Sequence, residues 1–259
     1  LGGLDTTYCC IYLKELGYEV HTVTVNTGGF DAEELASLEV KSKELGAISH
    51  QNVDATEEFY QKSIKYLIAG NVLKNNTYPL SVSAERVFQA TAIAKEAIRL
   101  KAAAIAHGST GAGNDQVRFD MIFNILCPEV GIITPIRDKK LSREEEIKFL
   151  IDHGVSGNWE KALYSVNQGL WGTSVGGKET LTSDEYLPET AFPSQVTQDG
   201  SEEIAIGFEH GEPVSVNGEK LGPVKTIEKI NELANPYGVG RDIHVGDTII
   251  GIKGRVGFE

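Results

Sequence analysis

The chain has 259 residues, of which 41% are hydrophobic and 24% charged, a mixture typical of one large folded domain or two modest ones. The 24 basic and 37 acidic residues give a formal net charge of −13, which disfavours a nucleic-acid-binding surface. There is no apolar run of the roughly 18–20 residues that a membrane span needs and no signal peptide. Three cysteines, two of them adjacent, favour neither a disulfide framework nor a metal site. We therefore expect a cytoplasmic protein with no membrane partner, and we assign no residue as a metal ligand.

The first 160 residues alternate between helical and strand patterns. A helix capped by Thr6 or Thr7 and ending at Gly17 is expected first. The elements expected after it are strand 19–26, helix 31–45, strand 48–53, helices 59–73 and 83–100, strands 102–106 and 130–134, and helix 142–151. The apolar run 102–106 is typical of a central parallel strand covered on both faces. This order predicts an α/β fold with a doubly wound, mainly parallel sheet, whose ligands bind beyond the carboxyl ends of the strands.

The character of the sequence changes near residue 160, where we place a domain boundary between 1–160 and 161–259. A strand at 203–208, a hairpin at 214–219 turning on Asn217-Gly218, a helix at 225–234 and a last strand at 248–253 are expected. The second part is therefore predicted to be α+β.

The chain opens on a loop-like segment, Leu1-Gly2-Gly3-Leu4-Asp5-Thr6-Thr7, with no strand before it. Glycines at the mouth of a helix let the backbone approach a ligand, the helix N-terminus offers N–H donors and the hydroxyls add more, which together suit a phosphate group. The spacing is not that of a P-loop, and an ordinary loop with a threonine cap is an equally good interpretation.

A denser polar segment, Gly108–Phe119, follows the predicted central strand. Arg118, Asn114 and Thr110 are suited to anchor the carboxylate of an amino acid, and Asp115 is suited to anchor its ammonium group. The alternative is a solvated turn in which Asp115 caps the next helix.

These segments carry a resemblance to a known family. The opening loop resembles the pyrophosphate-binding loop of the N-type ATP pyrophosphatases. Taken together with the string Gly-x-Thr-Gly-x-Gly-Asn-Asp-Gln-Val-Arg-Phe at 108–119, it makes the sequence resemble one family, the argininosuccinate synthases. Matches at 78–83, 164–174 and 238–241 extend the resemblance over the whole chain. It implies an ATP-binding domain at 1–160 and a synthetase and oligomerisation domain at 161–259.

The resemblance further implies a C–N bond-forming ligase of arginine biosynthesis. It would join L-citrulline to L-aspartate through a citrullyl-adenylate, with Mg²⁺ on the phosphates of ATP. The products would be argininosuccinate, AMP and pyrophosphate, and the assembly a homotetramer.

The family's site residues carry over by position. The residues implied for ATP are Gly2, Gly3, Leu4, Asp5, Thr6, Thr7, Val25, Gly108, Thr110, Gly111 and Gly113. Those implied for aspartate are Thr110, Asn114 and Asp115. Those implied for citrulline are Tyr78, Ser83, Asn114, Arg118, Ser165 and Ser174. Asn114, Asp115 and Arg118 are expected to carry the chemistry. The plainer alternatives are that Tyr78 only packs a turn, that Ser165 caps a helix and that Trp171 belongs to the core.

The sequence also departs from the family pattern. Leu1 replaces a serine of the loop, and Gly246 and Phe258 stand where many members carry Glu and Tyr. The chain stops at Glu259, short of the family's C-terminal helix, so we expect it to be incomplete at both ends. Two other functions stay open: another N-type ATP pyrophosphatase such as a tRNA thiolase, which the net charge and the lack of a separated cysteine pair disfavour, and a nucleotide-binding assembly protein that has lost catalysis.

Overall fold

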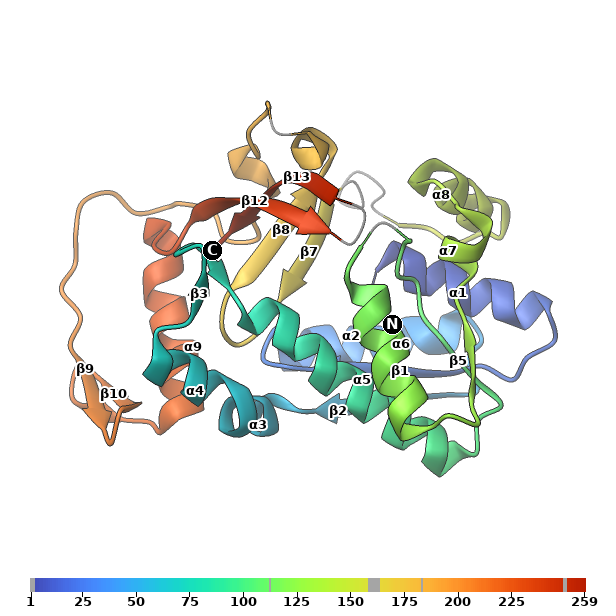
Figure 1. The fold of residues 1–259 in the computed structure, drawn as a ribbon, viewed down its shortest axis with the longest axis horizontal. Helices are drawn as coiled ribbons and strands as arrows, with labels where there is room; N and C mark the ends of the chain where they lie inside the picture. Colours follow the sequence, from blue (N-terminus) through green and yellow to red (C-terminus); the bar gives the residue numbers. More distant parts are fainter. Residues whose placement is uncertain (1–2, 112, 158–163, 183, 249–250) are drawn as a thin grey trace.

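The computed structural model describes residues 3–111, 113–157, 164–182, 184–248 and 251–259. An N-terminal α/β region and a C-terminal region of antiparallel sheets lie side by side (Figure 1). The expected boundary near residue 160 falls outside the described residues. None of the helices in these ranges combines the length and apolar character that crossing a membrane demands.

The N-terminal region contains the elements expected from the sequence in the expected order, together with helices at 115–126 and 135–139 and short strands at 73–74 and 78–79 that the list of expected elements did not include. Its helices are α1 (Leu4–Glu15), α2 (Ala32–Glu44), α3 (Thr56–Phe59), α4 (Lys65–Gly70), α5 (Ser81–Leu100), α6 (Asp115–Leu126), α7 (Pro135–Lys139) and α8 (Arg143–Asp152), with a π-helical turn at Tyr60–Ile64. Its strands are β1 (His21–Asn26), β2 (Ser49–Asp54), β3 (Leu73–Lys74), β4 (Tyr78–Pro79), β5 (Ala104–Ala106) and β6 (Gly131–Ile133). The prediction of one helix over 59–73 was wrong, because the π-turn divides a helical stretch that begins at Thr56 and ends at Gly70.

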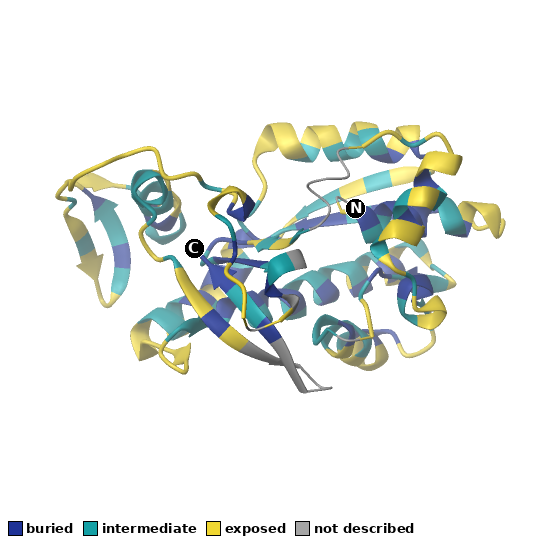
Figure 2. Cartoon of the chain, turned by 90° about the horizontal axis from the view of Figure 1, so that it is seen from above, coloured by how far each residue is buried: buried dark blue, intermediate teal, exposed yellow. Residues whose placement is uncertain are grey.

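Helices cover both faces of the parallel strands, as the predicted doubly wound fold requires. β1 pairs in parallel with β2, and β5 with β6. Neighbouring strand residues point to opposite faces, and Ile105 packs with α5 and α6 whereas Ala106 packs against Cys10 and Leu13 of α1. Figure 2 shows the outer surfaces of the helices largely exposed.

Among its described residues, the C-terminal region forms two antiparallel sheets. Its strands are β7 (Tyr164–Gln168), β8 (Thr173–Gly177), β9 (Ile206–Glu209), β10 (Glu212–Val216), β11 (Glu219–Lys220), β12 (Asp242–Thr248) and β13 (Gly251–Phe258). Its helices are α9 (Pro223–Ala234) and short 3₁₀ turns at Lys178–Leu181, Glu189–Ala191 and Asn235–Tyr237. One sheet has the order β12-β13-β8-β7 and the other β11-β10-β9, which confirms the α+β prediction.

Turn chemistry was a better guide here than strand propensity. Asn217 and Gly218 have φ of 49° and 86° and turn the hairpin between β10 and β11 as predicted. The single strand expected at 248–253 was wrong, because β12 ends and β13 begins within that range. β13 runs through glycines that propensity takes as strand breaks, since pairing with both β12 and β8 holds it extended.

The turn between β7 and β8, which we call the junction turn (residues 168–172), packs into the N-terminal region. The Leu170 amide donates to the Thr27 carbonyl at 2.9 Å, and the Ser81 hydroxyl donates to the Trp171 carbonyl at 2.5 Å. The Leu170 side chain is 1% exposed and packs with Phe59, Tyr60, Ile64 and Ile227. The two regions therefore share one hydrophobic cluster.

Candidate functional site

The opening loop forms the N-terminus of α1. The helix begins at Leu4 with Gly3 as its N-cap, so the prediction that Thr6 or Thr7 caps it was wrong. Both hydroxyls instead donate back to the Gly3 carbonyl, at 3.1 Å and 2.8 Å. A first helical turn leaves backbone N–H groups without intrahelical acceptors, which suits an anionic ligand. Thr7 is 1% exposed, so Thr6 is the better placed of the two hydroxyls.

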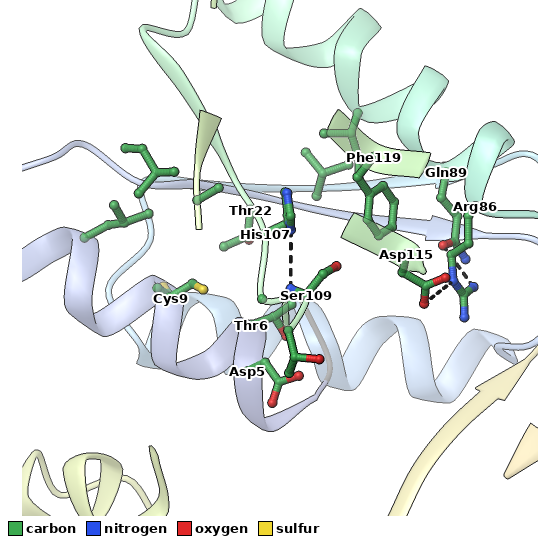
Figure 3. A pocket seen from close by; sticks show the side chains of 18 of the residues that line it. Asp5, Thr6, Cys9, Thr22, Arg86, Gln89, His107, Ser109, Asp115 and Phe119 are labelled. Carbon is green, nitrogen blue, oxygen red and sulfur yellow. Dashed lines mark hydrogen bonds and ion pairs between the residues drawn. The ribbon is translucent and has the colours of Figure 1, made fainter. Parts of the chain in front are cut away.

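Leu1 and Gly2 lie outside the described residues, and the remainder of the loop meets the second glycine-rich segment. A Cβ on Gly108 would collide with the Cβ of Asp5, so the two segments touch through this glycine. A cavity of about 580 Å³ opens between them (Figure 3). Residues from both constellations and from β7 line it: Asp5, Thr6, Gly108, Thr110, Gly113, Asp115 and Ser165.

A second carboxyl stands behind Asp5. Glu146 of α8 is 2% exposed, and its Oε2 has no hydrogen-bond partner among the residues that the structure describes. Burial, and next the negative charge of Asp5, raise the pKa of Glu146 to about 8. Burial also raises the pKa of Asp5, against the opposing effects of Arg143 and of a hydrogen bond with Glu146. The pair therefore favours sharing a proton at neutral pH.

Three of the six residues implied for citrulline, Arg118, Ser83 and Tyr78, are linked by hydrogen bonds. Arg118 donates from Nη1 to Asp115 Oδ1 at 2.6 Å and from Nη2 to Ser83 Oγ at 3.0 Å. Ser83 and Tyr78 hydroxyls lie 3.1 Å apart. A guanidinium with two neighbouring hydroxyls suits an amino-acid carboxylate. Tyr78 is therefore hydrogen-bonded to the first turn of α5 as well as lying in β4 before Pro79.

Strands of the C-terminal region pack beside this hydrogen-bonded series of side chains. Phe258 of β13 packs edge-on against Tyr78 with ring centroids 5.1 Å apart. Ser174 is buried opposite Phe258 in the β8–β13 pairing. Ser165 lies in β7 and is exposed, so the helix-cap alternative for it was wrong.

Other expected residues lie apart from the cavity lining. Val25 is 7% exposed within β1, paired with Val53 of β2. Asn114 is the N-cap of α6, so it is Asn114 and not Asp115 that occupies the cap position. Trp171 packs against the shared hydrophobic cluster, which confirms the core interpretation.

Sequence reasoning missed a polar network that holds the glycine-rich loop. Arg137 of α7 donates to Asp120 Oδ2 at 2.7 Å and to Gln116 Oε1 at 3.0 Å, and Gln116 Nε2 donates to the Gly111 carbonyl at 2.5 Å. His107 lies 2.9 Å from Asp120, and burial lowers the pKa of this imidazole. Gln116 lay inside the motif, but nothing local to Arg137 indicated that α7 reaches the loop.

Arg86 of α5 was also missed, although it lines the cavity. It is 5% exposed, and its Nε donates to Asp115 Oδ2 at 3.2 Å (Figure 3). Arg86 follows Ser83 by three residues, so helical periodicity alone could have placed the two side chains on the same face of the predicted helix.

Comparisons with known proteins show which family the sequence matches. The family model described as the arginosuccinate synthase N-terminal HUP domain matches residues 1–156, and that of the C-terminal domain matches residues 164–259. The argininosuccinate synthase of Methanocaldococcus jannaschii is 42% identical over 263 residues, and that of Sulfurisphaera tokodaii is 39% identical over 260. Each alignment covers 100% of this chain and 66% of the relative. The protein from Pyrococcus furiosus is 38% identical over 100% of this chain and 63% of its own length.

Proposed function

Because the chain belongs to the argininosuccinate synthase family, we propose that it takes part in the ATP-dependent condensation of L-citrulline with L-aspartate. The ureido oxygen of citrulline attacks the α-phosphorus of ATP, and pyrophosphate leaves. The amine of aspartate then displaces AMP, and the product is argininosuccinate. The observation that carries this proposal is the chain Asp115–Arg118–Ser83–Tyr78 beside the cavity between the two glycine-rich segments.

ATP is assigned to the α1 side of the cavity. The N-terminal turn of α1 presents backbone N–H groups, and Gly108 lets the facing loop approach it closely. An acidic chain thus gains a local anion site without a basic surface. The domain at 1–160 is assigned to ATP binding and that at 161–259 to synthesis and assembly.

The two amino acids are assigned to the other side. Arg118 can present its planar guanidinium to the carboxylate of citrulline, with Ser83 and Tyr78 beside it. Asp115 can receive the ammonium group of aspartate, with Thr110 on the same cavity wall. Both charged side chains are paired with each other here, so binding exchanges one ion pair for two substrate contacts.

Mg²⁺ fits the donor set at the α1 end. Magnesium prefers one or two carboxylates together with substrate phosphates, and Asp5 offers a carboxylate on the cavity wall at the helix N-terminus. When bound, the ion would neutralise charge on the departing pyrophosphate.

A homotetramer in the cytoplasm completes the proposal. The three cysteines are free and buried, and burial raises the pKa of Cys9 to about 12, which suits a reducing compartment. Val117, Met121 and Ile125 form an exposed apolar row on α6 that an interface would cover. Light scattering of the full-length protein tests the assembly.

The test of the activity is aspartate-dependent AMP release. The full-length protein with ATP, Mg²⁺ and citrulline should exchange pyrophosphate into ATP, and added aspartate should release AMP. Absence of aspartate-dependent AMP would refute the proposal. Salt-sensitive tRNA binding would favour a tRNA thiolase, and ATP binding without citrulline binding in calorimetry would favour an assembly protein.

A further inference from the structure

One buried carboxyl on α5 has no role in the assignment above. Glu85 is 2% exposed, and its Oε1 accepts from Nη1 of the adjacent Arg86. Its Oε2 accepts from the Thr27 hydroxyl at 3.4 Å. A Cβ on Gly169 of the junction turn would collide with this same oxygen. Glu85 therefore sits where α5, the loop after β1 and the junction turn meet.

Arg86 links this carboxyl to the site. Its guanidinium is shared between Glu85, Asp115 and the side-chain oxygen of Gln89, which lies 3.2 Å from Nη1. Asp115 also forms an ion pair with Arg118. The cluster holds two carboxylates and two guanidinium groups, so its formal charge is zero while Glu85 is ionised.

We propose that Glu85 is a positioning residue for the aspartate-binding carboxylate, which acts by sharing Arg86 and so leaving Asp115 able to receive an ammonium group. Without the charge on Glu85, Arg86 would pair more strongly with Asp115, and the cluster would carry a net positive charge. The ammonium group of aspartate would then compete with Arg86 for Asp115 and would be repelled by the positive charge of the cluster. The inference rests on the proposed function, since it concerns the substrate of that site.

The environment of Glu85 gives the proposal a pH dependence. Burial raises the pKa of Glu85 to about 7, the adjacent Arg86 opposes this, Asp115 from α6 adds to it and Thr27 opposes it. The junction turn faces Glu85 with the backbone of Gly169. Glu85 is therefore ionised above about pH 7 and neutral below it, so weak aspartate binding is expected at the acidic end.

The experiment compares Glu85→Gln with the wild type at about pH 8 and about pH 6, with KM for aspartate measured from AMP release. We expect the KM of E85Q to be about tenfold higher than wild type at pH 8 and the two values to converge at pH 6. Taking the ratio at each pH cancels the titration of aspartate itself. Citrulline-dependent pyrophosphate exchange, which needs no aspartate, should change by less than about twofold.

The matched control is Glu96→Gln on the same helix, where the carboxylate pairs with Arg99; its KM should equal wild type at both pH values. A KM ratio for E85Q that is the same at both pH values would mark a structural lesion and overturn the proposal, as would an unchanged KM. If the wild type releases no aspartate-dependent AMP, it is the proposed function that fails.

A second variant covers the case in which E85Q does not fold. Thr27→Val removes the hydroxyl that stabilises the ionised carboxyl while keeping the shape of the side chain. It should move the midpoint of the pH dependence of the aspartate KM to a higher pH. An unmoved midpoint would overturn the proposal.

Discussion

Leu170 of the junction turn should be one of the most costly residues in the chain to truncate. Leu170→Ala removes three carbons from a side chain that is 1% exposed. At about 0.8 kcal/mol for each buried carbon the transfer loss is about 2.4 kcal/mol, and the cavity left in a close-packed cluster brings the total to about 3–4 kcal/mol. Because its neighbours come from α3, the π-turn and α9, the cavity cannot close without moving both regions.

The assay is urea unfolding followed by tryptophan fluorescence, for which the neighbouring Trp171 is a reporter. Leu16→Ala is the matched control, since Leu16 is 55% exposed and the same truncation there should cost less than about 0.5 kcal/mol. A free-energy loss below about 1 kcal/mol for L170A, or one no larger than that of L16A, would refute the reasoning that this residue joins the two regions.

Three further predictions concern the site. Asp115→Asn should lower aspartate-dependent AMP release by at least about tenfold while pyrophosphate exchange is largely kept, and an equal loss in both assays would contradict its assignment to aspartate. Arg118→Lys loses the fork that reaches two partners, so the citrulline KM should rise about tenfold; an unchanged KM speaks against a carboxylate contact. Gly108→Ala should destabilise the fold by about 1–3 kcal/mol in urea unfolding and weaken ATP binding. Gly113→Ala is the control for the stability measurement, because a Cβ there would make an ordinary 3.7 Å contact; equal losses of stability in the two variants would show that the close approach at Gly108 is unimportant.

Local signals predicted most of the N-terminal elements. Asp31 and Ser142 each cap a helix through a capping box, a pattern that lies within four residues and is visible in sequence. β13 could not be found in this way, because its extended form depends on strands that lie elsewhere in the chain. The same reason explains why the strand at 248–253 was wrong.

The site shows a similar division. Thr110 and Asp115 could be singled out because the motif that holds them is contiguous and follows a predicted strand. Arg86 and Arg137 could not, since their relation to the motif depends on how α5 and α7 pack beside it. Glu85 looked like any helical glutamate, and only its burial distinguishes it.

The junction turn also has a consequence for which substitutions the molecule tolerates. A Cβ on Gly28 would lie 2.7 Å from the Cβ of Leu170, and one on Gly29 would lie 2.6 Å from the Gln168 carbonyl carbon. Much of this seam is thus backbone against backbone. In a saturation scan, we expect alanine at Gly28 or Gly29 to destabilise the fold as much as tryptophan does, whereas at an ordinary core position the loss of stability depends on the size of the new side chain. The orientation of the two regions therefore depends as much on glycines that allow close backbone contact as on the side chains that pack between the regions.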